Sequence, residues 1–281
     1  NLVSTNGPSA RMDSAMAYDP FRRRIVLHGG RNQNIYGDTW EWNGTNWLKL
    51  TESGPRNRVS HAMVYDMANK RVLLFGGVTF TGRTAELFGD TWAWKGATWQ
   101  KLDDDPQLAR FAHSMVFDDE RNVVVLFGGT NKDSENKEHA LSDTWIWNEN
   151  QWSLVSEEGP PARAGHAMAY HPLRKSVFLF GGGTDSGIMN DLWEWNGSYW
   201  TYIREADSPS RFFHVMGYDP TLEGLFTFGG TQSESFPLSA MRTTEVFHPT
   251  TIRIDPPTPT SLPIDTSTPT NTPTHTAEPT D

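Results

Sequence analysis

The chain has 281 residues, a formal net charge of -10, no cysteine and 12 tryptophans. The lack of cysteine excludes disulfides, thiolate metal sites and cysteine nucleophiles. The negative charge and the scattered Lys and Arg residues argue against a nucleic-acid partner. No apolar run approaches the roughly 18 residues that a membrane span needs. We therefore expect a soluble protein with one large or two ordinary domains.

One sequence pattern recurs five times along the chain. The copies begin at Arg11, Arg58, Arg110, Arg163 and Arg211, and each aligns without a gap up to a shared Gly-Gly. Successive arginines lie 47, 52, 53 and 48 residues apart by subtraction. Four copies are followed by DTWEWNGTNW or a close variant, and these four segments hold all the tryptophans.

The sequence of each copy predicts four short strands. The second copy illustrates the first two of these strands, and the first copy illustrates the third and the fourth. A strand over residues 61–66 is joined by a tight turn to RVLLFGG, which is apolar on both faces and so must be covered on both sides. In the third strand Trp40 and Trp42 project from one face. Asn43-Gly44 is a strong hairpin signal that leads into a fourth strand, residues 46–50. We find no helical period in the repeat region.

Four-stranded antiparallel units of this length stack radially as the blades of a β-propeller. The sequence therefore predicts an all-β propeller of five blades over residues 1–248, with the tryptophan pairs filling the space between neighbouring blades.

The repeated Arg-x-x-His, the Tyr-Asp turn, the Phe-Gly-Gly and the Trp-x-Trp resemble kelch repeats. The segment DTWEWNG resembles in particular the kelch-like repeats of bacterial extracellular proteins. The resemblance covers residues 1 to about 248. It implies that a ligand binds the face where the turns that carry the repeat arginines and the loops after Gly-Gly line the mouth of the channel. Kelch propellers serve as protein-binding, glycan-binding and occasionally enzymatic scaffolds.

Residues 249–281 have a different composition, with 8 Pro and 11 Thr by count and few apolar side chains. Such a segment cannot bury enough surface to order itself, and we expect an extended, disordered tail. It is either a Thr/Pro-rich stalk or a plain linker, and both interpretations favour a secreted or cell-surface protein.

The candidate ligand-binding residues all lie on the face that the resemblance implies. They are Arg31, Tyr36, Arg58, Phe80, Arg83, Phe88, Arg110, Phe111, Arg163, Arg211, Phe212 and Phe213. Arg and aromatic side chains in variable loops suit both protein contacts and sugar stacking. The alternative for the repeat arginines is pairing with the repeat aspartates Asp38, Asp90, Asp143 and Asp191. For the aromatic residues the alternative is ordinary loop packing.

His61, His113, His166 and His214 recur three residues after the repeat arginines, with Ser14 at that place in the first copy. A recurring position in a repeat protein favours a structural role, so we interpret these histidines as hydrogen bonders between blades and not as a metal ring.

We assign no catalytic residue, metal or cofactor. No GxSxG, HExxH, P-loop or dinucleotide fingerprint occurs. The copper radical chemistry of some kelch proteins needs a cysteine, so it is excluded here. We expect a monomeric binding module for a protein or a glycan. The alternative is a carbohydrate-active enzyme of epimerase, lyase or hydrolase type. That enzyme should show two carboxylates, or a His and a carboxylate, within about 5–10 Å at the channel mouth.

The two ends of the repeat region suggest how the ring closes. Residues 1–11 superpose on residues 153–163, so the chain begins inside a fourth strand, whereas the fifth copy offers a third strand near residues 244–248 and only a marginal TIRI as a fourth. We predict that Leu2 to Ser4 pair with the strand near Glu245 to Phe247 and complete the fifth blade. The competing account places further blades upstream of Asn1.

Overall fold

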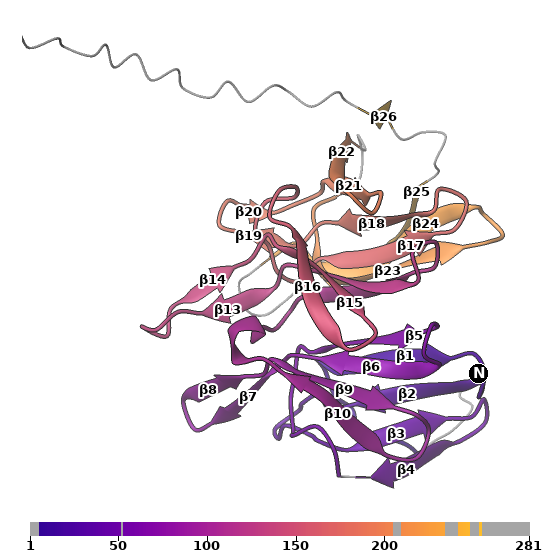
Figure 1. Ribbon diagram of the computed structural model, residues 1–281, viewed down its shortest axis with the longest axis vertical. Helices are drawn as coiled ribbons and strands as arrows, with labels where there is room; N and C mark the ends of the chain where they lie inside the picture. The colour runs from indigo at the N-terminus through magenta and orange to yellow at the C-terminus, as the bar shows by residue number, and fades with distance from the viewer. Residues whose placement is uncertain (1–5, 52, 205–208, 234–240, 248–252, 255–281) are drawn as a thin grey trace, which may run out of the picture.

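The computed structural model contains five antiparallel β-sheets, the blades of a propeller (Figure 1). Residues from all five blades line a central channel. The structure describes residues 6–51, 53–204, 209–233, 241–247 and 253–254. The short 3-10 turn Pro106–Leu108 is the one helical element of this described part. The prediction of an all-β propeller with five blades is confirmed.

The first four blades each have four strands, and chain order within a blade is also spatial order. Blade 1 comprises β1 (Ala15–Asp19), β2 (Arg24–His28), β3 (Thr39–Trp42) and β4 (Trp47–Thr51). Blade 2 comprises β5 (Ala62–Asp66), β6 (Arg71–Phe75), β9 (Asp90–Trp94) and β10 (Trp99–Asp104). Blade 3 comprises β11 (Ser114–Asp118), β12 (Val123–Phe127), β15 (Thr144–Asn148) and β16 (Gln151–Ser156). Blade 4 comprises β17 (Ala167–His171), β18 (Ser176–Phe180), β21 (Leu192–Trp195) and β22 (Trp200–Arg204).

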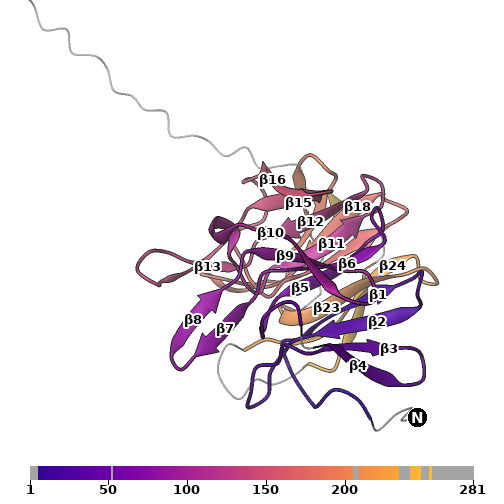
Figure 2. The same cartoon turned by 60° about the horizontal axis from the view of Figure 1, so that its bottom comes forward.

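Three small hairpins follow the Gly-Gly pairs of blades 2, 3 and 4. They are β7 (Val78–Thr81) with β8 (Thr84–Leu87), β13 (Thr130–Lys132) with β14 (Glu138–Ala140), and β19 (Gly183–Thr184) with β20 (Gly187–Ile188). All three project from the same side of the molecule, on the left in Figure 1. The hairpins of blades 2 and 3 extend furthest from the sheets, as the second view also shows (Figure 2).

Blade 5 has three strands in the described part of the chain: β23 (Phe212–Asp219), β24 (Gly224–Thr231) and β25 (Thr244–Phe247). The third strand lies where the sequence predicts it. The marginal fourth strand is wrong, because β26 (Arg253–Ile254) pairs with β22 of blade 4 instead. The predicted closure through Leu2 to Ser4 lies outside the described residues, as does the tail apart from β26.

The core lies between the blades. The second strands are buried on both faces, as their sequence predicts, and Leu73 and Leu74 are fully covered. Trp94, Trp147 and Trp195 each pack against the preceding blade. The fourth-strand tryptophans add a hydrogen bond across the same interfaces, for example from Trp99 Nε1 to Thr39 Oγ1 at 2.9 Å. The prediction that tryptophans fill the space between blades is confirmed at these interfaces.

The Gly-Gly pairs of blades 1 to 4 each dock their blade onto the next one. Gly76 and Gly77 have positive φ angles of 69° and 100°, and the Gly77 N–H donates to the Arg110 carbonyl at 2.8 Å. A Cβ on Gly76 would lie 2.6 Å from that carbonyl oxygen. Glycine is therefore needed here both for its backbone angles and for the close approach of the next blade.

Candidate functional site

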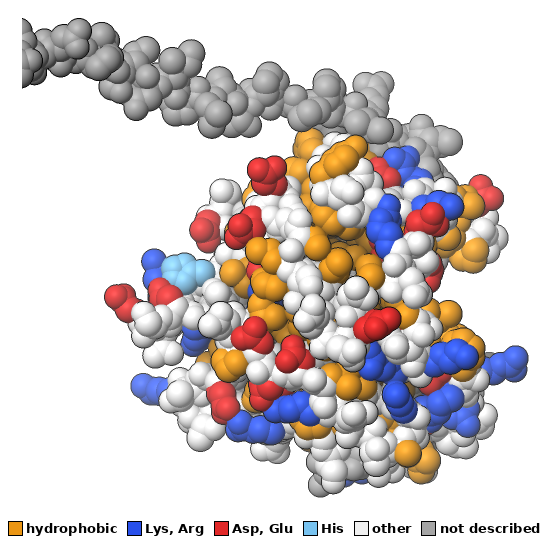
Figure 3. Space-filling view, viewed as in Figure 1, with side chains coloured by type: hydrophobic (Ala, Val, Ile, Leu, Met, Phe, Trp, Pro, Cys, Tyr) orange, Lys and Arg blue, Asp and Glu red, His pale blue; other side chains and the backbone are white. Residues whose placement is uncertain are grey.

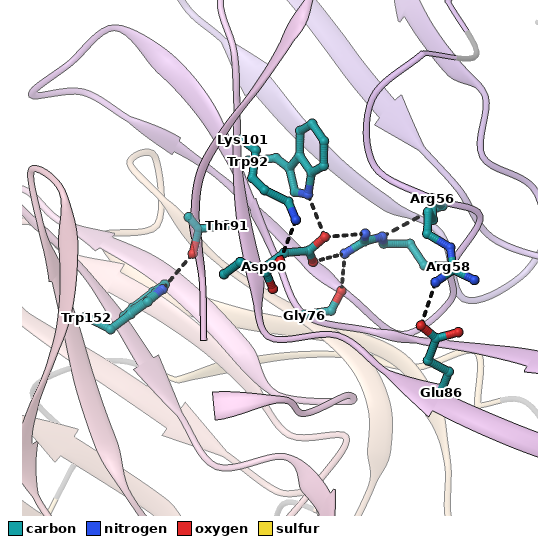
Figure 4. A network of polar contacts seen from close by, with 10 residues as sticks. Arg56, Arg58, Gly76, Glu86, Asp90, Thr91, Trp92, Lys101 and Trp152 are labelled. Atoms are coloured by element: carbon teal, nitrogen blue, oxygen red, sulfur yellow. Dashed lines mark hydrogen bonds and ion pairs between the residues drawn. The ribbon is translucent and has the colours of Figure 1, made fainter. Parts of the chain in front are cut away.

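The repeat arginines are buried beneath the face that the resemblance implies. Arg58 has no exposed surface, and its guanidinium donates to both carboxylate oxygens of Asp90, at 2.6 and 2.9 Å, and to the Gly76 carbonyl at 2.8 Å (Figure 4). Asp90 also accepts from Trp92 Nε1. The same arrangement joins Arg110 to Asp143, Arg163 to Asp191, and Arg11 to Asp38.

Burial would raise the pKa of Asp90, but the hydrogen bonds from Arg58 and Trp92 outweigh it and hold that pKa below its usual value. Arg58, Arg110 and Arg163 are thus structural ion pairs that a ligand on the surface does not reach. This corrects the expectation that they bind a ligand and supports the alternative of pairing with the repeat aspartates.

Blade 5 makes the same ion pair with a different residue. Thr243 stands where the other blades have aspartate, and the buried Arg211 pairs instead with Glu245, two residues later. Glu245 occupies the register of Trp92 in blade 2, because it pairs with Thr227 as Trp92 pairs with Leu74. Arg211 is therefore also structural, and its assignment to the ligand site is corrected on the same ground.

Two aromatic candidates lie against these arginines. The Tyr36 ring is 4.1 Å from the guanidinium carbon of Arg11, and the Phe88 ring is 4.1 Å from that of Arg58. Phe88 is buried and Tyr36 is partly buried. Both rings cover a buried cation, so the interpretation of loop packing replaces that of ligand binding at these two positions.

The recurring histidines line the channel and contact the preceding blade. The His113 ring meets Phe75 edge-on with centroids 5.4 Å apart, and His214 meets Phe180 in the same way at 5.5 Å. Among the described residues no partner has good hydrogen-bond geometry to their ring nitrogens. The ring of His113 still has a backbone hydrogen-bond contact with Phe75 of the preceding blade, and that of His166 has one with Phe127, so edge-on packing accompanies the contacts between blades that we expected. Burial, with help from the adjacent Arg110 and Arg211, lowers the pKa of His113 and of His214 to about 3.

The residue before each recurring histidine, and before Ser14 in blade 1, has a left-handed backbone conformation. These residues are Asp13, Ser60, Ala112, Gly165 and Phe213. Their peptide groups form a chain of hydrogen bonds around the channel, in which the N–H of Ser60, Ala112, Gly165 and Phe213 donates in turn to the carbonyl of the preceding member at 2.7–3.0 Å. A left-handed backbone costs roughly 1–2 kcal/mol for a residue with a Cβ, and it is unusual for a residue as large as Phe213. Such strain is typical of functional sites.

A pocket of about 500 Å³ opens above this chain, at the mouth of the channel. Its apolar wall consists of Met12, Val59, Val78, Phe80, Phe111 and Phe213. Met12, Phe80 and Phe213 are exposed, whereas Val59 and Val78 form a buried floor and are bridged to each other. Beneath the pocket the channel narrows to a cavity of about 300 Å³ lined by the recurring histidines.

The polar groups of the mouth are few. Arg31 and Asp13 line the pocket as an exposed ion pair, with Nε and Oδ2 2.7 Å apart. Arg83 is exposed at the tip of the β7–β8 hairpin, and Phe212 stacks on Phe213 with centroids 4.6 Å apart. Of the twelve candidates, the structure thus brings Arg31, Phe80, Phe111 and Phe213 together in one pocket, with Phe212 beside Phe213.

A family model described as the KLHDC2/KLHL20/DRC7 Kelch-repeats domain matches residues 90–236, which is just over half of the chain. The chain belongs to the kelch-repeat family. Its fold also resembles that of YjhT, whose solved structure aligns at a TM-score of 0.64 and 15% sequence identity, over 83% of this chain and 76% of that one.

Several lining residues of the kelch propeller's mouth are missing from the candidates that sequence reasoning selected, and Met12 and Val59 are two of them. Both follow a repeat arginine, and the same position holds Phe111 in blade 3. The bridges Met12 to Arg31, Val59 to Val78 and Phe111 to Thr130 show that the chain is extended there. Successive side chains alternate in direction along extended backbone, so the residue after a buried arginine points toward the mouth. This rule would have identified Met12 and Val59 from the sequence.

Few ionisable side chains line the pocket at the mouth of the kelch propeller. Asp13 is the only carboxylate among the described residues that line either the pocket or the channel cavity. In the same described part, no group of three or more His, Asp or Glu side chains is placed to hold a metal ion. No described helix has the length and apolar character to cross a membrane.

Proposed function

We propose that the channel-mouth pocket of this kelch propeller binds a protein segment by accepting one large apolar side chain. The observation that carries the proposal is the wall of six apolar side chains, half of them exposed, around an open pocket. Exposed apolar clusters of this kind are costly in water and mark interaction sites. The kelch propeller is commonly a protein-interaction module, which supports this class of partner.

The pocket suits an aliphatic or aromatic anchor better than a sugar ring. Met12, Val59 and Val78 offer no hydrogen bonds, and glycan sites need several polar partners for the hydroxyl groups. The ion pair of Arg31 and Asp13 at the pocket can make polar contacts with the backbone beside the anchor. Charged side chains of both signs are interspersed with apolar ones on the face seen in Figure 3.

We further propose that the protein acts outside the cell as a monomer. The Thr/Pro-rich composition of residues 249–281 and the resemblance of DTWEWNG to bacterial extracellular repeats support the location. Digestion of intact source cells with an added protease tests it. Loss of the protein from intact cells, or its presence in the medium, is expected, and full protection until lysis would contradict the location.

A displayed peptide library selected on the purified full-length chain tests the binding site. We expect the selected peptides to share one large apolar residue and to lose about tenfold or more in affinity for Phe80→Ser and for Phe213→Ser. Phe21→Ser is the matched control, because Phe21 is equally exposed but lies in the turn between β1 and β2, away from this mouth. Peptides that bind all three variants equally, or a glycan array that alone gives binding, would contradict the proposal.

A further inference from the structure

Four of the five turns that join the first and second strands of a blade carry an exposed apolar side chain. These turns end the sheets on the side opposite to the Gly-Gly loops, because antiparallel strands are joined alternately at their two ends. We call this side the turn face. Phe21, Met67, Leu173 and Leu222 are 58%, 40%, 63% and 47% exposed. Polar residues are usual in tight turns, so an apolar residue in four equivalent turns indicates a contact surface.

The same turns share one residue with a left-handed backbone. Arg23, Lys70, Asn122, Lys175 and Glu223 occupy equivalent places, with φ angles from 49° to 57°. Gly and Asn adopt this conformation at the least cost, and a long charged side chain has no such advantage. Blades 1, 2 and 4 nevertheless hold Arg or Lys there. Retained backbone strain of this kind is typical of functional surfaces.

In blades 1 and 2 these cations are exposed and unpaired. Arg23 and Lys70 have no acidic partner among the described residues, whereas Lys175 in blade 4 pairs with Glu120 at 3.1 Å. The Nζ atom of Lys70 lies 5.1 Å from the centroid of the Phe21 ring. The basic turn of blade 2 therefore lies beside the apolar turn of blade 1.

The hairpin between β9 and β10 brings a third cation to this place. Lys95 is exposed there and makes no ion pair within the described part of the chain. A Cβ on the next residue, Gly96, would lie 2.6 Å from the guanidinium of Arg22, so this hairpin touches the turn of blade 1. Lys and Arg side chains gather toward the lower right of Figure 3, where Figure 1 places this end of blades 1 and 2. We call Phe21, Arg23, Met67, Lys70 and Lys95 the basic–apolar patch.

The carboxylates beside the basic–apolar patch are engaged within the protein. Asp19 is buried and accepts from the backbone of its own turn. Asp66 is buried and pairs with Arg71 at 2.9 Å, and Glu41 pairs with Arg22 at 2.6 Å. The charge that remains exposed at the patch is therefore positive, although the chain as a whole carries a net charge of -10.

We propose that the basic–apolar patch docks the turn face on the surface of an anionic lipid bilayer. Lys and Arg side chains are attracted to anionic headgroups, and apolar side chains among them enter the boundary between headgroups and acyl chains. Side chains on neighbouring turns fit a broad, flat surface, whereas a protein segment is usually bound in a groove or at a sheet edge. The proposal does not depend on the proposed function, because the pocket of Phe80 opens on the other face.

Sedimentation of the full chain with lipid vesicles gives the first test. We expect binding to vesicles of phosphatidylglycerol and phosphatidylcholine in equal parts, much weaker binding to phosphatidylcholine alone, and release by added salt. Phe21→Ser should weaken binding to the anionic vesicles about tenfold, whereas Phe80→Ser on the other face should leave it unchanged. Absence of binding to the anionic vesicles would overturn the proposal, whether or not the mouth binds peptides.

Replacing two cations separates a binding role from a structural one. The double variant Arg23→Asn, Lys70→Asn should bind the anionic vesicles about 25-fold less, at roughly fivefold for each cation. Its unfolding free energy should not fall, because Asn tolerates a left-handed backbone better than Arg or Lys does. The matched control is Arg83→Asn, Lys137→Asn, which removes two exposed cations from the hairpins of the mouth. Equal binding by the two double variants would contradict the proposal.

A fluorescent label reports which face meets the bilayer, because the protein has no cysteine of its own. An environment-sensitive dye on Met67→Cys should shift to the blue when anionic vesicles are added, and the same dye on Arg83→Cys should not. Binding without a shift at position 67 would show that another face docks. Binding of poly-glutamate that the Arg23→Asn, Lys70→Asn variant loses, without binding to vesicles, would assign the patch to an acidic protein segment. Either result would overturn the proposal.

Discussion

A guanidinium that is removed from water needs a partner for each of its N–H groups, and the repeat arginines satisfy this need within one repeat. Arg58 donates to the carboxylate of Asp90 and to the carbonyl groups of Gly76 and Arg56. The pair fixes the start of β9 against the end of β6, beneath the loops of the mouth. The arginines thus contribute to the candidate site by holding its scaffold.

Arg163→Ala should destabilise the protein by about 3–5 kcal/mol, because it leaves the buried Asp191 without its partner. Arg31→Ala removes an exposed ion pair with Asp13 and should cost less than about 1 kcal/mol. Urea unfolding of both variants measures the difference. Equal costs would show that burial of the repeat pair has no energetic role.

Trp94→Ala should cost about 3–5 kcal/mol, since the ring is fully buried against blade 1 and leaves a cavity. Trp42→Ala should cost clearly less, because Trp42 has the same register in blade 1 but is only partly buried. Thermal and urea unfolding test the pair of variants. A folded Trp94→Ala protein of unchanged stability that no longer binds its ligand would assign this ring to the binding site instead.

At the scale of the element, the four-stranded blades and their order could be predicted because one pattern recurs in register. The hairpin β7–β8 could not be predicted, since its strands Val78–Thr81 and Thr84–Leu87 lack a counterpart in the first repeat. Blade 5 departs because Phe247 has the register of a tryptophan and Glu245 makes the ion pair that an aspartate makes in the other blades. The missing tryptophan is visible in the sequence, but the new ion-pair partner is visible only when contacts are known.

The candidate site could be predicted only in part, for a related reason. Sequence reasoning named four residues that line the pocket, among them Phe80 and Phe111. It did not separate Arg31, which is exposed, from Arg58, which is buried, because both are arginines in turns of the same face. The difference arises from the alternation of side chains along extended backbone, which places the repeat arginines inside.

Gly76→Ala and Gly229→Ala form a matched test of how blades dock. Both glycines have similar positive φ angles, 69° and 73°, so each substitution should cost roughly 1–2 kcal/mol in backbone strain. Gly76→Ala should cost about 1–3 kcal/mol more, because its Cβ meets the carbonyl of the next blade. Equal losses in unfolding free energy would mean that the close contact between blades contributes nothing.

At the scale of the whole molecule, the channel carries buried histidines that the fold keeps neutral. The pKa of His113 and of His214 is lowered to about 3 by burial, against about 6.5 in the unfolded chain. Between these values the unfolded chain binds more protons than the folded protein. The unfolding free energy therefore increases with pH between these two values. The contribution of the two neutral histidines to stability is lost as the pH falls through this range.

We expect the urea midpoint to fall as pH is lowered from about 6.5 to about 5, where carboxylates are still largely ionised in both states. The double variant His113→Gln, His214→Gln should show a smaller fall than the wild-type protein over the same range. Unfolding curves at several pH values measure both slopes. Identical slopes would exclude these two rings as the source of the acid sensitivity.

The channel has an apolar mouth at each end, and we assign the partner to the one that Phe80 lines. The opposite mouth is a pocket of about 530 Å³ that Tyr18, Tyr65 and Phe117 help to line. A photo-crosslinking amino acid placed at Phe80, and separately at Phe21 beside the opposite mouth, tests the assignment directly with a selected peptide. We expect the peptide to be captured at position 80 and not at position 21. Capture at position 21 alone would contradict the assignment.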